Sequence, residues 1–502
     1  MGRRIRLHDF AGRPVSLPDG PEAWTDGEGQ WLRPATGETE SDSVLLFGLG
    51  PGRPETLPFT RGKRVFWLEA PRILRRLNDT RPPGRIPENW LKTSVRQALE
   101  LAPRCRIYEY RLNRRLAPQF WGPLMGRIAA ERVNMDRKPN GEANCGALRR
   151  PAGCAGSGEG RRGTVLLPGT DRQLLHQELV RALRGAGFGV VEPPLWPGGK
   201  NSQLALTVWE ETIVRHRPVL ALSVNLRGLD PEGKIFWLCR ALGMAVAVWC
   251  VDNPWHLLSS MPSPWWKKAA LFVTDASFVP LLQRSGALAI HHLPLAAAPH
   301  MWRQDGELRC ERLPQTPLFV GHSVFPGQSR FFAAARVPQD MLAQAMRAWL
   351  ADDRPDSPAN APQFHWWMEK LRLCPWPGQA VRRAGLGADT CSRARRARWI
   401  GAALPAGLRI IGDDGWRNFF PGMDISPPVD YYTALPSRYA RSVVLNVTSL
   451  LLPHSLSQRH FDVWAAGGLL LTDATPGLEI FPQELTRPVI LERPEDFAPR
   501  FA

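Results

Sequence analysis

The chain has 502 residues, of which 44% are hydrophobic and 22% charged, so it can bury the cores of two or three domains and is not a largely disordered chain. No apolar run approaches the roughly 20 residues that a bilayer crossing needs. No apolar segment follows the basic first residues, so we expect a cytoplasmic protein without a secretory signal or transmembrane segment, for which peripheral membrane association stays open. The formal net charge is +17, but only eight of the 64 basic residues are lysines, and the arginines are spread along the chain. Such a diffuse field favours anionic ligands in general and predicts no specific nucleic-acid partner.

Eight cysteines are scattered along the chain without a C-x-x-C pair. They stand at positions 105, 145, 154, 239, 250, 310, 374 and 391. This spacing predicts reduced, mostly structural thiols and no metal site.

Residues 1–136 predict an N-terminal α/β module that carries a glycine-rich turn. Two buried strands, Ser43–Phe47 and Arg64–Leu68, flank the turn Gly48–Gly52, and Glu69 follows the second strand. This pattern resembles the beginning of a Rossmann unit that binds a dinucleotide or a methyl donor, with an acid at the distance of a ribose. Prolines after the glycines would break the helix that should receive the phosphates. We therefore expect a tight turn in a degenerate module.

Residues 137–162 are rich in Gly, Arg, Cys and Ala, lack apolar periodicity and predict a linker. Residues 163–300 then alternate short apolar strands with helices, which is typical of a parallel sheet covered on both faces. The expected strands are 164–167, 188–191, 219–224, 244–251 and 271–274, and the expected helices are 171–185, 208–216, 235–242 and 277–285.

Residues 316–502 predict a second α/β domain with a helical insertion at about 326–400. The expected strands are 317–321, 408–411, 442–446 and 468–472, and a helix is expected at 457–466. Because ligands of open α/β sheets bind beyond the carboxyl ends of the strands, the residues that follow these strands are the candidates for a site.

Residues 445–481 resemble the C-terminal signature of GT-B glycosyltransferases, in particular the spore-maturation CgeB-like family (glycosyl transferases group 1). In that family an arginine precedes Phe-Glu, a small-residue helix end, an apolar strand and a Gly-Leu-Glu turn. The matching residues here are Arg459, Phe461-Asp462, Ala465-Ala466-Gly467-Gly468, Leu469–Thr472 and Gly477-Leu478-Glu479. Trp249–Pro254 and His292–Ala296 resemble two further family segments, so the resemblance extends over about 163–502.

The resemblance implies an α/β fold with two Rossmann-like domains of GT-B type facing a cleft, the acceptor side at 163–300 and the donor side at 316–502. It also implies a bacterial glycosyltransferase that moves a sugar from a nucleotide-diphosphate donor to a protein, glycan or other cell-surface-related acceptor. The nucleotide sugar is then a co-substrate, and the resemblance implies no cofactor, no metal ion and retention of configuration.

Arg459 is expected near the start of the helix that ends at Gly467, where a guanidinium can bind the leaving diphosphate; the alternative is a surface arginine. Asp462, one turn later, is placed to accept hydrogen bonds from ribose hydroxyls, although the family has the longer Glu there. His454 stands where many related retaining enzymes carry an acid facing the donor sugar. It is a candidate phosphate or sugar contact, and it departs from the usual paired-acid mechanism.

The remaining candidates follow strands. Gly321 would let a phosphate approach the backbone, and Asp252 would bind the acceptor or act as general base, or else form a turn. The pair Gly467 and Gly468 allows close approach of a ligand or of packed elements. Gly477 begins a turn whose amides could face the diphosphate. Glu479 could accept a sugar hydroxyl, or be an ordinary acid at a helix start.

Two other functions remain open. The first is a catalytically inactive protein of the same fold that acts as a binding protein or scaffold in surface-polysaccharide or appendage assembly, which the departures at His454 and Asp462 favour. The second is a nucleic-acid-binding protein, against which stands the lack of a clustered basic and aromatic surface.

Overall fold

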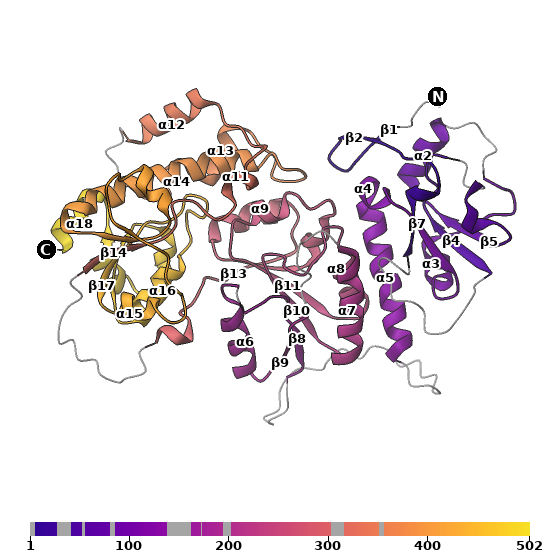
Figure 1. Cartoon of the computed structure of the whole chain (residues 1–502), viewed down its shortest axis with the longest axis horizontal. Coiled ribbons are helices and arrows are strands. Elements are labelled where there is room, and N and C mark those ends of the chain that lie inside the picture. The colour runs from indigo at the N-terminus through magenta and orange to yellow at the C-terminus, as the bar shows by residue number, and fades with distance from the viewer. Residues whose placement is uncertain are drawn as a thin grey trace. The chain divides into compact units, whose positions relative to one another are not determined.

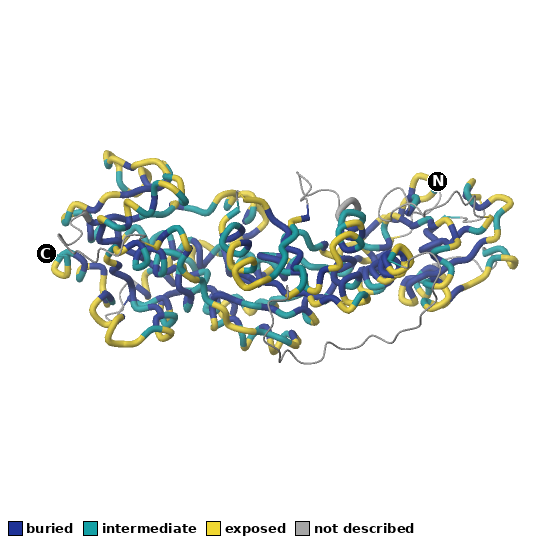
Figure 2. Tube along the Cα trace, turned by 90° about the horizontal axis from the view of Figure 1, so that it is seen from below, coloured by how far each residue is buried: buried dark blue, intermediate teal, exposed yellow. Residues whose placement is uncertain are grey.

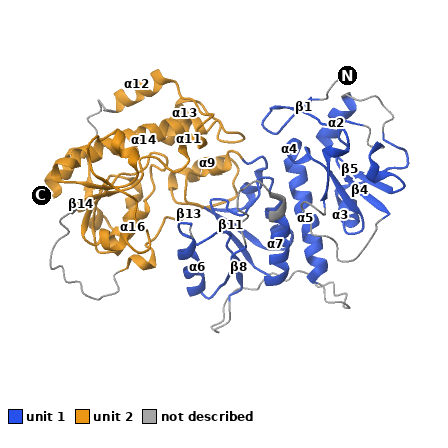
Figure 3. Ribbon diagram, in the orientation of Figure 1, with its two compact units in different colours: residues 1–249, 261–271 blue, residues 250–260, 272–502 orange. Residues whose placement is uncertain are grey.

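The computed structural model describes residues 6–27, 42–52, 56–80, 86–137, 162–171, 173–193, 202–302, 316–350 and 356–501. The fold is mixed α/β, with largely parallel sheets and helices between their strands (Figure 1). The chain divides into two compact units, residues 1–249 with 261–271 and residues 250–260 with 272–502 (Figure 3). The predicted domain boundaries stay predictions, and residues 138–161 of the predicted linker lie outside the described residues.

The N-terminal module is built on a five-stranded sheet in the order β3-β7-β4-β5-β6. Its strands are β3 (Trp24–Asp26), β4 (Ser43–Phe47), β5 (Arg64–Leu68), β6 (Leu91–Lys92) and β7 (Arg106–Tyr110), and only β3 pairs antiparallel. A hairpin of β1 (Arg6–His8) and β2 (Pro14–Ser16) precedes the sheet. The helices are α2 (Pro71–Thr80), α3 (Val95–Leu101), α4 (Asn113–Leu116) and α5 (Pro118–Arg137). The strands predicted at 43–47 and 64–68 are confirmed.

The glycine-rich turn of this module is closed by the acid that could have bound a ribose. Glu69 is buried, and its Oε2 accepts a hydrogen bond from the Leu49 amide at 2.9 Å while its Oε1 accepts one from the Ala70 amide at 2.8 Å. A buried carboxylate needs such donors, and here the turn supplies one of them through the Leu49 amide. The prediction of a tight turn is confirmed.

Helix α5 joins the N-terminal module to the next sheet within the first unit. It packs against α8 (Lys234–Ala241), the helix between the third and fourth strands of the following sheet. Gly122 and Gly126 make this approach possible, because a Cβ at either position would collide with the backbone carbonyls of Glu232 and Lys234, respectively.

The second sheet has the order β13-β12-β11-β10-β8-β9. Its strands are β8 (Thr164–Leu166), β9 (Gly189–Val191), β10 (Leu220–Val224), β11 (Ala245–Cys250), β12 (Ala270–Val273) and β13 (Ala289–His292). The associated helices are α6 (His176–Gly185), α7 (Ser202–His216), α8, α9 (Pro254–Leu258) and α10 (Val279–Arg284). Helix α6 begins five residues later than predicted, because Leu175 before it has a left-handed φ of 69°.

The third sheet lies in the second unit and has the order β16-β15-β14-β17-β18-β19, with all its strand pairs parallel. Its strands are β14 (Thr316–Val320), β15 (Arg409–Ile411), β16 (Ile425–Ser426), β17 (Ser442–Asn446), β18 (Leu469–Asp473) and β19 (Ile490–Leu491). The predicted helical insertion between β14 and β15 contains α11 (Gln328–Phe331), α12 (Gln339–Leu350), α13 (Phe364–Lys370) and α14 (Arg382–Ala403). The remaining helices are α15 (Leu435–Tyr439), α16 (Gln458–Ala465), α17 (Gln483–Thr486) and α18 (Phe497–Phe501). The predicted α/β fold, with its N-terminal module and helical insertion, is confirmed.

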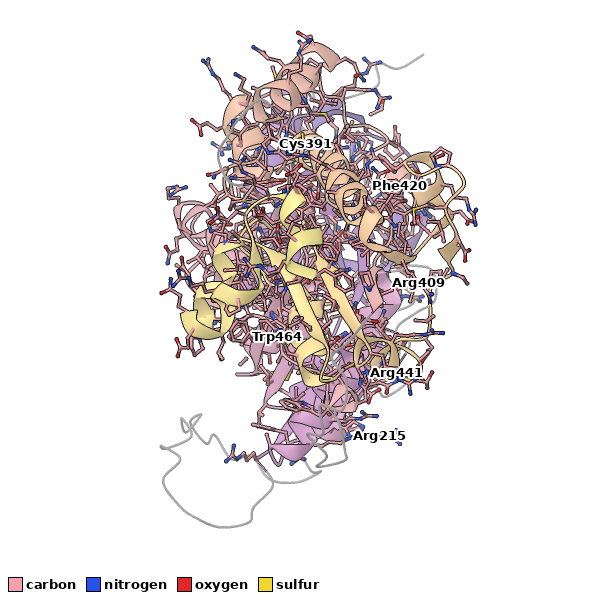
Figure 4. All side chains as sticks on the ribbon, turned by 90° about the vertical axis from the view of Figure 1, so that its left-hand side faces the viewer. Arg215, Cys391, Arg409, Phe420, Arg441 and Trp464 are labelled. Atoms are coloured by element: carbon pink, nitrogen blue, oxygen red, sulfur yellow. The ribbon has the colours of Figure 1, made fainter. Side chains whose placement is uncertain are left out.

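Apolar cores cover both faces of this third sheet. Val443 and Leu445 of β17 pack on one face with residues of α14 and α18, whereas Val444 packs on the other with residues of α15 and α16. This alternation is the period of two that a strand imposes. Figure 2 colours the trace by burial, and buried stretches alternate along it with exposed ones. Cys391 of α14 and Trp464 of α16, labelled in Figure 4, belong to the two covering layers.

A fully buried arginine fastens α14 to the strand ends of this sheet. Arg395 donates from Nε to Asp356 Oδ1 at 2.8 Å, and its Nη1 lies 2.7 Å from Asp473 Oδ2 at the end of β18. Asp473 in turn accepts from the amide and the hydroxyl of Thr448, which follows β17. Burial lowers the pKa of Arg395, but the carboxylates of Asp473 and Asp356 raise it by more, so the pKa lies above its ordinary value. The guanidinium therefore stays charged.

Among the described residues, no helix is both long and apolar enough to cross a membrane. The described cysteines at 105, 239, 250, 374 and 391 are free thiols, as predicted for these positions.

We predict that Arg395→Met lowers the free energy of unfolding by about 3–5 kcal/mol, because it leaves two buried carboxylates without their cation. Urea denaturation of both proteins measures the difference. Arg398→Met is the matched control on the same helix, since the ion pair that Arg398 forms among the described residues is with the exposed Glu495, at 3.4 Å. This variant should lose no more than about 1 kcal/mol. An equal loss in the two variants would contradict the role given to Arg395.

Candidate functional site

A cavity of about 640 Å³ lies in the second unit beyond the carboxyl ends of β14 and β17. Four segments line it: the start of α9 and the turn before it, the loop after β14 with α11, helix α14, and the loop after β17. Its polar lining residues are Asp252, Asn253, His256, His322, Asp389, Arg396 and Ser449, and its apolar ones are Leu257, Val324, Phe325, Pro326, Phe331, Leu451 and Leu452. The position agrees with the rule that ligands of open α/β sheets bind beyond the strand ends.

Arg396 is the cation of this cavity. Its guanidinium donates to the carbonyl oxygens of His322 at 2.8 Å and Ser323 at 3.0 Å, and lies over the ring of Trp416. Its Nε is buried and has no hydrogen-bond partner within the described residues. Burial lowers its pKa to about 10, so the side chain is still a cation at neutral pH.

The loop after β14 is held rigidly beside the cavity. Asp413 accepts from the Ser323 amide at 2.6 Å and from its hydroxyl at 2.8 Å, and Trp416 Nε1 donates to the Gly321 carbonyl at 2.8 Å. Asp413 thus caps this loop. The backbone at the lining residue His322 and at its two neighbours is therefore held by hydrogen bonds with Asp413, Trp416 and Arg396.

The structure brings together two predicted residues, Arg459 and Gly321, next to this loop. Arg459 lies in the first turn of α16, donates from Nε to Asn446 Oδ1 at 2.9 Å, and donates from Nη1 to the Val320 carbonyl. A Cβ at Gly321 would lie 3.2 Å from that Nη1, so the glycine leaves room for the guanidinium. Nη2 of Arg459 makes no hydrogen bond to a described residue. Arg459 does not itself line the cavity, but the residues that it contacts, Val320 and Gly321, directly precede the lining residue His322.

A layer of neutral polar groups lies beneath Arg459. His460 is fully buried, its Nδ1 accepts from the Ser457 amide at 3.1 Å, and its Nε2 lies 3.1 Å from Thr472 Oγ1. Burial lowers the pKa of His460 to about 4, so it is uncharged at neutral pH. Ser457 and His460 also cap the start of α16 and thus fix where Arg459 stands.

Asp462 is directed into the interior, away from the cavity lining. Its Oδ2 accepts from the Tyr431 hydroxyl at 2.8 Å, and its Oδ1 accepts from Gln458 Nε2 at 2.9 Å and from the Ala298 amide at 3.3 Å. Burial raises its pKa above the ordinary value. Its oxygens are occupied by protein donors in this arrangement, so the ribose contact stays a prediction that requires a rearrangement.

The predicted glycines near α16 make close packing contacts. Gly467 ends α16 with a left-handed φ of 78°, the usual way to stop a helix. A Cβ on Gly468 would collide with the Tyr439 carbonyl, and one on Gly477 would lie 2.6 Å from the His454 carbonyl. For Gly467 and Gly468 these contacts support the packing interpretation that the sequence left open, whereas the diphosphate contact of the turn at Gly477 stays a prediction. Glu479 is exposed and does not line the cavity.

The two candidates for chemistry occupy different places. Asp252 follows β11, is exposed and lines the cavity, as expected for a residue that meets a substrate. His454 is half-buried, and its backbone amide donates to Asp275 Oδ2 at 2.9 Å. His454 is not part of the cavity lining.

Comparison with known families bears on the C-terminal part of the chain. Residues 393–501 match a family model described as glycosyl transferase-like. The match supports a glycosyltransferase, and it contains Arg396, Arg459 and the cavity residues that follow β17. A search of curated proteins finds no match.

Sequence reasoning missed Arg396, His256 and Asp389 of the cavity. Arg396 was visible only as a member of the arginine cluster 393–398, and nothing in that run distinguishes the residue that faces the loop after β14. His256 lies among the rings of Phe331, Phe332 and Phe364, and burial lowers its pKa to about 3. Its neutral ring forms part of the apolar wall.

Buried neutral histidines predict acid sensitivity. The pKa of His460 is lower in the folded than in the unfolded chain, so the unfolded chain binds more protons, and stability falls as pH falls from about 6.5 to about 4. We expect His460→Gln to remove about one proton from the proton uptake on unfolding over this window, measured as the slope of unfolding free energy against pH. His216→Gln, at an exposed position of α7, is the control and should leave the slope unchanged. An unaltered slope in the His460 variant would contradict the neutral buried imidazole.

Proposed function

We propose that the protein transfers a sugar from a nucleotide-diphosphate donor to a protein, glycan or other cell-surface-related acceptor in the bacterial cytoplasm, and that the donor binds beyond the carboxyl ends of β14 and β17. The observation that carries this proposal is the cavity whose cation, Arg396, belongs to the segment that matches the glycosyl transferase-like model. The volume of about 640 Å³ is within the range of small-molecule sites.

The charge at the strand ends suits the departure of a diphosphate. Breaking the bond between the sugar and the phosphate oxygen leaves negative charge on the leaving group, which fixed cations stabilise. Arg396 of α14 and Arg459 of α16 both donate to backbone carbonyls at or just after the end of β14. Burial is the main cause of the lowered pKa of Arg396, and the positive charge of Arg459 lowers it further, as expected for two guanidinium groups that repel each other. Two cations held near each other by protein carbonyls are poised to be neutralised by an anion. In this proposal the arginines stabilise the charge without a metal ion.

Polar groups of the lining would orient the reacting sugar and the acceptor. Asp252, His322 and Ser449 come from three different segments and face the same cavity. Asp252 is proposed to bind the acceptor hydroxyl or to take its proton, since it is exposed there. Retention of configuration, expected from the resemblance to the CgeB-like family, is part of the proposal.

A catalytically inactive binding protein of the same fold is the second candidate. The observation that favours it is the interior position of Asp462, whose carboxylate is held by Tyr431 and Gln458. Such a protein would bind a nucleotide without transferring a sugar, so the two candidates differ in turnover and agree in binding.

Calorimetric binding of nucleoside diphosphates and nucleotide sugars tests the donor site. We expect one nucleoside diphosphate to bind, and Arg396→Ala to weaken it by about 1.5–3 kcal/mol, the contribution of a charged hydrogen bond. Arg398→Ala, an exposed arginine half a turn further along α14, should bind like the unmodified protein.

Thermal melts of both variants show whether the loop after β14 still folds. Binding that is equally strong in the two variants would remove the cavity as the donor site. Absence of any binding by the unmodified protein would overturn the proposed function.

A further inference from the structure

A second group of polar side chains lies near the cavity but is not among the residues that line it. Asp275 follows β12, Ser277 is in the next turn, His365 is in the first turn of α13 and His454 lies in the loop after β17. The loop after β17 links this group to the cavity, because Leu451 and Leu452 line the cavity and the His454 amide binds Asp275 Oδ2 at 2.9 Å.

The hydrogen bonds of this group fix the position of one proton. Asp275 is fully buried and accepts from the Ser277 amide at 2.8 Å, from the Ser277 hydroxyl at 2.5 Å and from the His454 amide. A carboxylate with three donors can only accept, so the single hydroxyl proton of Ser277 points to Asp275. Ser277 Oγ also lies 2.8 Å from His365 Nε2, and that contact therefore requires Nε2 to carry the proton.

The opposite nitrogen of His365 is then an acceptor. A neutral imidazole has one N–H, so protonation of Nε2 leaves a lone pair on Nδ1. Burial lowers the pKa of His365 to about 4, with Asp275 raising it and the charges of His454 and Arg284 lowering it, so the ring is neutral at pH 7. Within the described residues Nδ1 of His365 has no hydrogen-bond partner and is not enclosed by protein.

The imidazole of His454 offers further ring nitrogens for hydrogen bonding near this acceptor. The ring nitrogens of His454 make no hydrogen bond to the described residues and are likewise not enclosed. The ring of His365 packs against the ring of Phe278, with 4.6 Å between the ring centroids, and the backbone amide of His365 donates to the side chain of Gln363. These contacts hold the imidazole in place. A fixed acceptor without a protein donor suits a ligand group that donates a hydrogen bond.

We infer that the hydrogen bonds linking Asp275, Ser277 and His365 hold the imidazole of His365 in its Nε2–H form, so that Nδ1 accepts a hydrogen bond from a hydroxyl group of the substrate. Asp275 and Ser277 are positioning residues, and His365 contacts the ligand. The hydroxyl-bearing ligand rests on the proposed function and has two sources, the sugar of the donor and the acceptor. The assignment of the proton does not rest on it.

Nitrogen-15 NMR of histidine-labelled protein tests the proton assignment without any ligand. The His365 signal, identified by its loss in His365→Gln, should show the Nε2–H form at pH 7. Ser277→Ala should release the ring into a mixture of both forms. An Nδ1–H form in the unmodified protein, or an unchanged ring in Ser277→Ala, would overturn the inference even if nucleotide binding is found.

Two substitutions at position 365 test the hydroxyl contact. His365→Asn keeps an oxygen acceptor near the place of Nδ1, whereas His365→Gln keeps a group that can reach Ser277 and loses that acceptor. We expect His365→Gln to weaken its ligand about 3- to 10-fold, with His365→Asn closer to the unmodified protein. Both should bind the nucleoside diphosphate alone with unchanged affinity.

The pattern of losses identifies the source of the hydroxyl. If His365→Gln has a larger dissociation constant for the nucleotide sugar, the hydroxyl belongs to the donor sugar. If it has only a raised KM for the acceptor, the hydroxyl belongs to the acceptor. Equal behaviour of the two variants with both ligands would overturn the hydroxyl contact. If the unmodified protein binds no nucleotide, the proposed function fails, and titration of free hexoses decides the contact: an Nδ1 signal that no hexose shifts overturns it.

Discussion

The arrangement of the second unit depends on one buried ionic contact, that of Arg395 with Asp356 and Asp473. Removing three charges from water is costly, and the cost is offset only where every charged group finds close partners. Here the partners come from the end of β18, the segment before α13, and α14 itself. The contact therefore sets the position of α14 over the strand ends. Arg396, the next residue along the helix, is directed to the loop after β14 as a consequence.

The proposed donor site depends on the difference between these two neighbouring arginines. Arg395 is neutralised by carboxylates and serves the fold, whereas Arg396 is held by two backbone carbonyls and Arg459 by one backbone carbonyl and the side-chain oxygen of Asn446. Uncharged acceptors of this kind orient a guanidinium without cancelling its charge. Beneath them, His460 is kept uncharged by burial, so that no further cation is added to the layer. Asp389, which also lines the cavity, raises the pKa of Arg396, yet neither Arg396 nor Arg459 forms an ion pair within the described residues, so both guanidinium groups can meet an anionic ligand.

The sequence predicted the strands well because each is a short apolar run, and β14, β15, β17 and β18 were expected within a residue or two of their observed bounds. The meeting of Arg459 and Gly321 was also within reach, since a helix start and a strand end at the same edge of a parallel sheet approach each other. Arg395 and Arg396 could not be told apart within one arginine run, because their partners are contributed by residues up to 78 positions away, as Asp473 is for Arg395. The expectation that Asp462 contacts the ligand has the same origin. The Tyr431 hydroxyl that binds Asp462 in the interior comes from another segment, and the residues around Asp462 do not predict this contact. The local sequence pattern predicts the helices and strands. Which polar side chains remain available to a ligand depends on partners that are distant in the sequence.

Photo-cross-linking with an azido derivative of the nucleoside diphosphate that binds tests the central claim most directly, because it reports where the ligand lies. Peptide mapping by mass spectrometry should find the label in the loop after β14, at 321–326, or in the loop after β17, at 449–452, and excess unlabelled nucleotide should suppress it. Label in the glycine-rich turn at 48–52 of the N-terminal module, with none in these two loops, would contradict a donor site at the carboxyl ends of β14 and β17.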